Sequence, residues 1–244
     1  MSVRFEVEGS TAWITVDRPE ARNAMTFAMY EELVRGFERV DADDQIQTMV
    51  ISGAGGRSFI AGTDINEFTR FQTPEDGVEY ERRVDAVLDR LEAVRKPTVA
   101  FVEGTAMGAG LAIAAACDVR VITPGASFGM PIARTVGNCL SMANYVRLSQ
   151  ALGASRLKDL IFTARRIAAE EAREIGFASA IVEPDEADDA LIRLCALLAE
   201  HSPTTLWVTK QALRRARVIP EGDDLIRLAY GSDGFRENVR RFLA

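Results

Sequence analysis

Short apolar strands alternate with helical segments along the first half of the chain, and no other feature limits the fold as strongly. Alternating or continuous apolar residues predict strands at residues 3–7, 12–16, 48–52, 98–102 and 118–122. Between them, apolar residues at helical spacing predict one helix that Thr26 caps and a second over residues 74–94. A chain that repeats strand, loop and helix packs its helices against a sheet through crossover connections. We therefore predict an α/β fold.

The chain beyond about residue 140 is predicted to be mainly helical. Apolar spacing places helices at residues 142–151, 155–162, 185–200, 203–216, 223–230 and 233–242. Ser155 can cap the second of these helices, and Ser202 followed by Pro203 is a strong start signal for the fourth.

Composition excludes several classes of function. The 244 residues carry 36 acidic and 29 basic side chains, and the net charge of −7 is not that of a basic nucleic-acid binder. The longest uncharged run, residues 104–117, is well short of the roughly 20 residues that a membrane span needs. Residues 1–10 contain no signal-peptide core. We expect a cytoplasmic protein with neither a nucleic-acid nor a membrane partner.

The few cysteine and histidine residues do not indicate disulfides, a metal site or histidine-dependent catalysis. Cys117, Cys139 and Cys195 show no C-x-x-C spacing, so neither a disulfide framework nor a zinc site is indicated. His201 is the only histidine, which disfavours His-dependent triads and multi-His metal sites. We expect no metal, and any acid–base chemistry falls to carboxylates, water, tyrosine or the backbone.

Two glycine-containing segments, residues 59–65 and 106–111, share one physical design. Each follows a buried strand and leads into a helix. Small residues let a ligand approach the backbone, and free amides at a helix N-terminus point at negative charge. Two such amides on one oxygen would form an oxyanion hole, worth roughly 3–4 kcal/mol of transition-state stabilisation per donor. The alternative is that the glycines serve only tight turns and packing.

A nucleotide site is a weaker interpretation of the second segment. Gly108-Ala109-Gly110 begins like G-x-G-x-x-G, but Ile113 occupies the last position, and no acidic residue follows at the expected distance. No G-x-x-x-x-G-K-[ST] motif occurs in the sequence. These departures disfavour a dinucleotide-binding or P-loop enzyme.

Four ordered stretches resemble the successive motifs of the enoyl-CoA hydratase/isomerase (crotonase) superfamily. They are Ile14–Met25, Phe59–Ile65, Val102–Gly110 with Ala116–Asp118, and Ser127–Pro131. The resemblance implies a crotonase-like spiral of strand-strand-helix units and an acyl-CoA thioester substrate, with coenzyme A as part of the substrate and no separate cofactor. It also implies a homotrimer or a dimer of trimers. Residues 1–185 would form the acyl-CoA-binding core, and the helical residues 186–244 would build the trimer.

Transferred residue by residue, the resemblance makes the backbone amides of Thr63 and Ala109 the oxyanion donors. A backbone amide survives the change from the family's usual glycine to Ala109. The implied contacts to coenzyme A come from Arg22 near the phosphates, from the backbone around Ala24, Ala61, Asp64 and Ile65, and from Phe242 of a neighbouring subunit.

The sequence also departs from the family pattern. Hydratases of this family use two glutamates to handle water, and their positions hold Ala112 and Ile132, which cannot move a proton. Just past Ile132, Asn138 is a candidate to orient water or substrate, although a simple turn role is the alternative. Cys139 is interpreted as core. Asp64 is interpreted as a helix cap rather than a base.

Two classes of function remain open from the sequence. In the first, the protein is an enzyme that forms a thioester enolate and isomerises, hydrates or cleaves the acyl group with unusual acid–base groups. In the second, it is a non-catalytic acyl-CoA-binding homologue. The polar stretch from Thr135 to Ser141 favours the enzyme, because an inactive pocket is free to become apolar.

Overall fold

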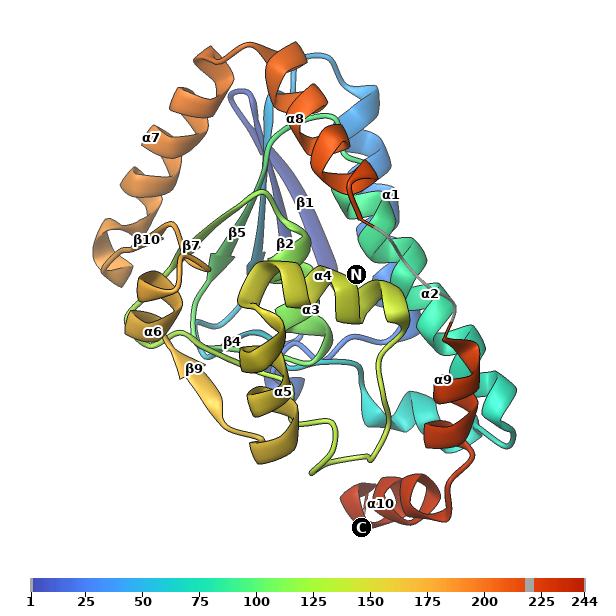
Figure 1. Ribbon diagram of the computed structural model, residues 1–244. Helices are drawn as coiled ribbons and strands as arrows, with labels where there is room; N and C mark the ends of the chain where they lie inside the picture. Colours follow the sequence, from blue (N-terminus) through green and yellow to red (C-terminus); the bar gives the residue numbers. More distant parts are fainter. Residues whose placement is uncertain (1, 218–221, 244) are drawn as a thin grey trace.

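The strands form two sheets in the computed structural model, which describes residues 2–217 and 222–243 (Figure 1). The larger sheet contains, in spatial order, β1 (Val3–Glu8), β2 (Thr11–Val16), β3 (Thr48–Gly53), β5 (Thr98–Val102), β7 (Val119–Ile122) and β10 (Ala180–Ile181). The smaller sheet contains β4 (Ser58–Ile60), β6 (Thr105–Met107), β8 (Ser127–Gly129) and β9 (Arg166–Ala168). The β1–β2 and β8–β9 pairs are antiparallel, and the other described pairs are parallel.

Ten α-helices and three short 3-10 helices occur in the described part of the chain. The α-helices are α1 (Phe27–Ala42), α2 (Pro74–Glu92), α3 (Ala109–Ala116), α4 (Met142–Leu152), α5 (Ala154–Thr163), α6 (Ala169–Glu174), α7 (Ala187–Glu200), α8 (Pro203–Arg215), α9 (Asp223–Tyr230) and α10 (Asp233–Leu243). The 3-10 helices are η1 (Pro19–Ala21), η2 (Ile65–Arg70) and η3 (Pro184–Glu186).

Three consecutive units build a spiral. In β3-β4-α2, β5-β6-α3 and β7-β8-α4, the first strand joins the larger sheet, the second joins the smaller sheet, and a helix follows. The prediction of an α/β fold and the strand-strand-helix spiral that the resemblance implied are both confirmed. The smaller sheet was not predicted, because each of its strands has only three residues, too few for a periodic signal.

Two of the three α-helix caps predicted from the sequence are present in the structure. The Thr26 hydroxyl accepts a hydrogen bond from the Met29 amide, and the Ser202 hydroxyl accepts one from the Thr205 amide. The prediction that Ser155 caps a helix is wrong, because α5 begins one residue earlier, directly after Gly153.

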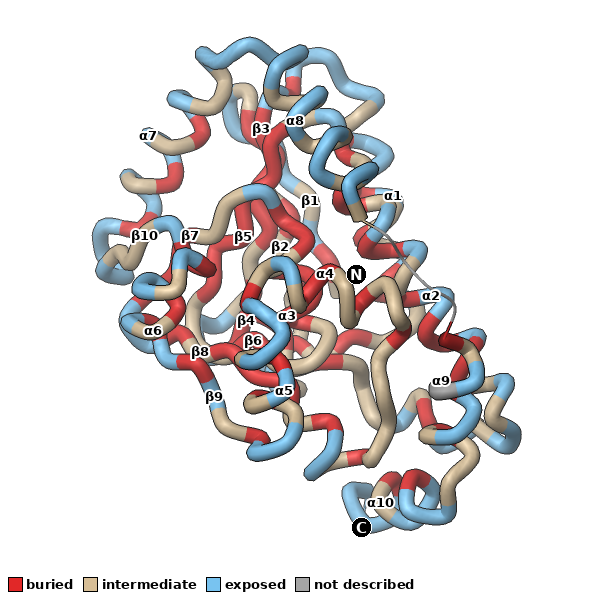
Figure 2. Tube along the Cα trace, in the orientation of Figure 1, coloured by how far each residue is buried: buried red, intermediate tan, exposed pale blue. Residues whose placement is uncertain are grey.

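Helix α3 lies at the centre of the molecule, and six of its eight residues are buried (Figure 2). Helix α7 covers the opposite face of the larger sheet, where Leu191 packs against Val50, Val99 and Phe101. In the described part of the chain, no helix is both long enough and apolar enough to cross a membrane.

The last two helices pack against their own chain. Helix α9 lies beside α2, and α10 lies beside η2 (Figure 1). The α2–α9 contact depends on Gly77, since a Cβ atom there would lie 2.2 Å from the Tyr230 ring. Leu191, Phe235 and Val239 are buried within this single chain, so these three apolar side chains are not available as a surface for assembly.

Candidate active site

The first glycine-containing segment is held in place by a buried asparagine. Asn23 adopts a left-handed conformation with φ of 58°, and its side chain is fully buried. Its Nδ2 donates to the carbonyl oxygens of Ser58 at 2.7 Å and Ala54 at 3.0 Å, while its Oδ1 accepts from the Arg18 amide at 2.9 Å. These bonds fix the loop of residues 22–25 against the turn between β3 and β4 and against the start of β4.

The same loop orients the Thr63 amide. The Met25 amide donates to the Gly62 carbonyl, and the Asp64 amide donates to the Met25 carbonyl, both at 2.8 Å. In an extended segment, successive backbone groups point in opposite directions. The Thr63 amide therefore points away from the loop, and it donates to no protein acceptor within the described ranges.

The second amide belongs to Ala109, the first residue of α3. The amides of a first helical turn have no partner inside the helix, and the helix dipole adds partial positive charge there. Gly108 precedes it with φ of 54°, and the Gly108 amide donates to the Gly129 carbonyl at 3.0 Å. Close packing brings the helix start against β4, since a Cβ atom on Gly110 would lie 2.0 Å from the Ile60 carbonyl oxygen.

Thr63 and Ala109 both line one cavity of about 150 Å³. The two turns lie side by side, because a Cβ atom on Gly108 would lie 3.7 Å from the Gly62 Cα. Much of the lining is apolar, and it includes Phe68, Val84, Met107, Ala112, Met130, Ile132, Val136 and Leu140. Ala112 and Ile132, which the family resemblance aligns with the hydratase glutamates, are among these residues and present no proton-carrying group to this cavity.

The structure brings most of the other predicted site residues to the same place. Ala61, Ile65, Asn138 and Phe242 line the cavity together with Thr63 and Ala109. Phe242 does so within its own chain, at the exposed end of α10.

Arg22, Ala24 and Asp64 lie beside the cavity rather than in its lining. Arg22 is exposed, and its carbonyl accepts from the Ala61 amide. Asp64 caps η2 by accepting from the Asn66 amide, and it forms an ion pair with Arg18 at 2.6 Å. Although partial burial opposes ionisation, the hydrogen bonds from Arg18 and Asn66 lower the pKa of Asp64 below its usual value. The interpretation of Asp64 as a helix cap is confirmed.

Thr63 is also held through its side chain. Its hydroxyl lies 2.7 Å from the Tyr30 hydroxyl and 2.7 Å from the Tyr80 hydroxyl. Both tyrosines are buried, and burial raises the pKa of each hydroxyl well above the ordinary value of 10.0. Two neutral tyrosines therefore fix the residue that carries the first amide.

A buried glutamate in the cavity lining was missed by the sequence analysis. Glu81 lies on α2 with 2% of its surface exposed. Its Oε1 accepts from the Tyr230 hydroxyl at 2.6 Å, and its Oε2 accepts from the Ser141 amide at 2.9 Å. Burial raises the pKa of Glu81 to about 8, against the effect of these two donors.

Asn138 joins this network. Its Nδ2 donates to the Tyr230 hydroxyl at 3.0 Å, whereas its buried Oδ1 has no hydrogen-bond partner in the described residues. A buried polar atom without a partner is costly, and a bound ligand or water can satisfy it. Cys139 is only partly buried and packs beside the core, so its interpretation as core holds in part.

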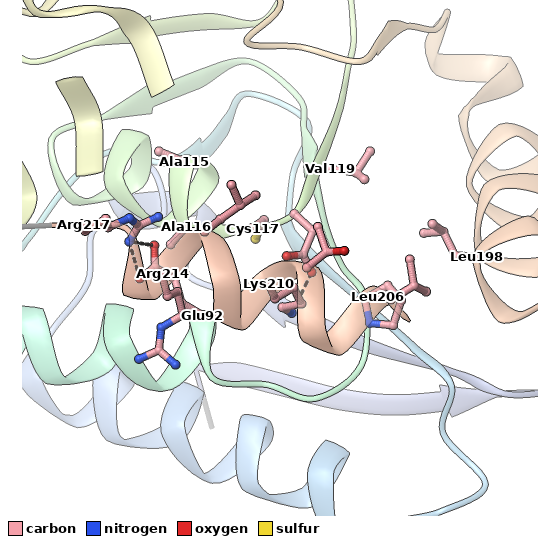
Figure 3. A pocket seen from close by; sticks show the side chains of 14 residues that line it. Glu92, Ala115, Ala116, Cys117, Val119, Leu198, Leu206, Lys210, Arg214 and Arg217 are labelled. Atoms are coloured by element: carbon pink, nitrogen blue, oxygen red, sulfur yellow. Dashed lines mark hydrogen bonds and ion pairs between the residues drawn. The ribbon is translucent and has the colours of Figure 1, made fainter. Parts of the chain in front are cut away.

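A second, larger cavity of about 360 Å³ lies at the other end of α3 (Figure 3). Two ion pairs lie in its lining, between Lys210 and Asp118 at 2.7 Å and between Arg217 and Glu92 at 2.6 Å. None of its lining residues is shared with the cavity of Thr63 and Ala109.

Two sheets joined by strand-strand-helix units define the class of this protein as a crotonase-fold α/β protein. The sequence profile of the enoyl-CoA hydratase/isomerase family matches residues 6–224. The chain therefore belongs to this family of enzymes.

Individual relatives agree with the assignment. The short-chain-enoyl-CoA hydratase of Clostridium acetobutylicum is 34% identical over 236 residues, which cover 97% of this chain and 88% of that protein. The 2,3-dehydroadipyl-CoA hydratase of Escherichia coli is 33% identical over 206 residues, which cover 84% of this chain and 79% of that protein. A solved enoyl-CoA hydratase/carnithine racemase from Magnetospirillum magneticum has the same fold, with a TM-score of 0.83 and 24% identity over 100% of this chain and 88% of that chain.

Proposed function

We propose that this protein is an enzyme that binds an acyl-CoA thioester, forms its enolate and then rearranges the acyl group. The observation that carries the proposal is that Thr63 and Ala109 line one cavity, since each offers a backbone amide to a bound oxygen there. Two donors on the thioester oxygen stabilise the negative charge that develops when a proton leaves the neighbouring carbon. Isomerisation, hydration and cleavage all pass through such an enolate.

The coenzyme A part of the substrate is assigned to the loop that anchors the first segment. Arg22 offers an exposed cation for the phosphates, and the backbone at Ala24, Ala61, Asp64 and Ile65 is assigned to the rest of coenzyme A, with Ala61 and Ile65 in the cavity lining. Phe242 adds an aromatic surface at the cavity mouth. No separate cofactor is required by this chemistry.

The alternative function is binding of acyl-CoA without turnover. The apolar side chains of Ala112 and Ile132 in the cavity favour it, because they supply neither an acid nor a base. The polar groups of Glu81, Thr135 and Asn138 in the same lining favour the enzyme.

Titration with acetoacetyl-CoA tests the proposed function, because its enolate absorbs in the near ultraviolet. We expect binding together with growth of the enolate absorbance, and much weaker binding of coenzyme A alone. Absence of acetoacetyl-CoA binding would overturn the proposal. Binding without enolate absorbance would support the non-catalytic alternative.

Hydration of crotonyl-CoA is expected to be slow. General acid–base catalysis typically contributes about 10²–10⁴-fold, and the two positions that the resemblance aligns with the hydratase glutamates hold the apolar residues Ala112 and Ile132. A direct spectrophotometric assay against an efficient hydratase measures the difference. Turnover equal to that of the efficient hydratase would show that other groups handle the water.

We also propose that the protein assembles as a homotrimer or a dimer of trimers through residues after about 185. Several large apolar side chains remain exposed on α7, α8 and α9, namely Ile192, Leu197, Val208, Leu213 and Leu228. Light scattering at micromolar concentration is expected to give the mass of three or six chains. A stable monomer would contradict the proposal.

A further inference from the structure

The cavity contains one carboxyl group, and its position suggests a use. Among the described residues that line the cavity, Glu81 is the only aspartate or glutamate. It lies on α2 in the layer that packs over α3, and the lining continues from it to Thr63 and Ala109. The cavity thus brings a carboxyl group and two oxyanion donors to one apolar space.

The other candidate groups are occupied or unsuitable. Asp64 is held in its ion pair with Arg18, and Asp85 is absent from the cavity lining. The Thr135 hydroxyl donates to the Pro131 carbonyl at 3.0 Å. Asn138 lines the cavity but has no proton to exchange at ordinary pH.

We propose that the Glu81 carboxyl is the catalytic acid and base that moves a proton at the carbon next to the thioester. The proposal rests on the proposed function, because it needs an acyl group whose thioester oxygen is held by Thr63 and Ala109. As a base, the carboxylate takes the proton, the C–H electron pair passes to the thioester oxygen, and the enolate forms. As an acid, Glu81 returns the proton to the same carbon or, in an unsaturated acyl group, to a carbon further along the chain.

One carboxyl group suits a proton shift better than hydration. Moving a proton between two carbons needs one group that removes it and gives it back. Hydration needs a water to be activated on one carbon while a proton is delivered to the other, which the family hydratases do with two glutamates. The single carboxyl of Glu81 therefore favours isomerase-type chemistry for this site.

Tyr230 acts as a positioning residue for Glu81. Its hydroxyl donates to Oε1 while accepting from Asn138, so a chain of hydrogen bonds links the carboxyl to Asn138. Gly77, four residues before Glu81 on α2, lets the Tyr230 ring pack directly against the helix. The backbone amide of Ser141 fixes the second carboxyl oxygen.

The surroundings set the pH range in which Glu81 exchanges its proton. The titratable groups that act on it are Tyr30 on α1, Tyr80 and Asp85 on α2, Cys139, Tyr145 on α4 and Tyr230 on α9. Burial raises the pKa values of the tyrosines and of Cys139, so they remain neutral near pH 7. Of these groups, only Asp85 has a pKa below that of Glu81. Burial raises the pKa of Asp85 to about 6 and that of Glu81 to about 8. Both values lie near working pH, where general acid–base groups are most effective.

Exchange of the α-protons of butyryl-CoA in D₂O, followed by NMR, tests the proposal. Wild-type protein is expected to exchange them, with a rate that rises as Glu81 deprotonates and levels off above pH 8. Glu81→Gln is expected to lose about 10²–10⁴-fold in exchange rate while its affinity for butyryl-CoA is unchanged. Glu79→Gln, on an exposed position of the same helix, is the matched control and is expected to behave as wild type.

A second variant keeps the test decisive if Glu81→Gln fails to fold. Tyr230→Phe removes a donor that stabilises the charged carboxylate, so the pH profile of exchange is expected to move to higher pH. Full exchange in Glu81→Gln, or an unmoved profile in Tyr230→Phe, would overturn the proposal. Exchange by wild-type protein that persists in Glu81→Gln would overturn the role of Glu81 alone, whereas wild-type protein that binds butyryl-CoA without exchange, or does not bind it, would overturn the proposed enolate chemistry as well.

Discussion

The Ala109→Pro variant is expected to lose about 10²–10³-fold in enolate formation, the usual cost of removing one oxyanion donor. Proline has no N–H, so the second amide disappears from the cavity. The helix tolerates the change, because Ala109 is the first residue of α3, a position that proline favours. Exchange of the α-protons of butyryl-CoA measures the loss.

The control for this variant is Ala109→Gly, which keeps the amide. It is expected to retain most of the exchange activity, since the structure requires only the backbone donor at this position. Equal activity in Ala109→Pro and Ala109→Gly would show that the Ala109 amide does not hold the thioester oxygen.

The second large effect is on stability rather than on activity. Because the folded protein raises the pKa of Glu81 from the ordinary 4.5 to about 8, the folded state keeps a proton that the unfolded chain releases between these values. The free energy of unfolding therefore falls as the pH rises through this window, by about 1.4 kcal/mol per pH unit from this group. Glu81→Gln removes the titrating group and this part of the pH dependence.

Urea unfolding at several pH values across this window measures the effect. Relative to wild type, Glu81→Gln is expected to become progressively more stable as the pH rises from about 4.5 to 8. The contribution of Asp85, whose pKa is also raised, is present in both proteins and largely cancels. A stability difference that does not change with pH would contradict the burial of a protonated Glu81.

Most of the larger sheet and most helices could be predicted because their signals are local. Continuous apolar runs identified β3 and β5, and the pattern of Ser202 with Pro203 identified the start of α8. The strands of the smaller sheet could not be predicted, because three residues give no periodicity and their partners come from distant parts of the chain.

The candidate site was predictable where backbone geometry determines it. The glycine-containing segments around Thr63 and Ala109 are visible in the sequence, and the cavity forms between them. Glu81 was missed, although it lies three residues before Val84 and seven before Leu88, on the apolar face of its helix. A charged residue in an apolar stripe is the signal that could have revealed it.

The other site features that were not predicted depend on hydrogen bonds between residues far apart in the sequence. The hydrogen bonds of Thr63 to Tyr30 and Tyr80 join α1, α2 and the loop after β4. The contact of Tyr230 with Glu81 joins residues 149 positions apart. Neither set of contacts leaves a local pattern, since each depends on how the spiral and the last helices pack.

The central claim is that the thioester oxygen of an acyl-CoA accepts hydrogen bonds from the Thr63 and Ala109 amides. The carbonyl stretching frequency of bound butyryl-CoA, labelled with ¹³C at the thioester carbon, measures this most directly by infrared difference spectroscopy. Two donors on the oxygen weaken the C=O bond, so a clear shift to lower frequency is expected on binding. A bound thioester whose frequency equals that in water, or lies above it, would contradict the assignment.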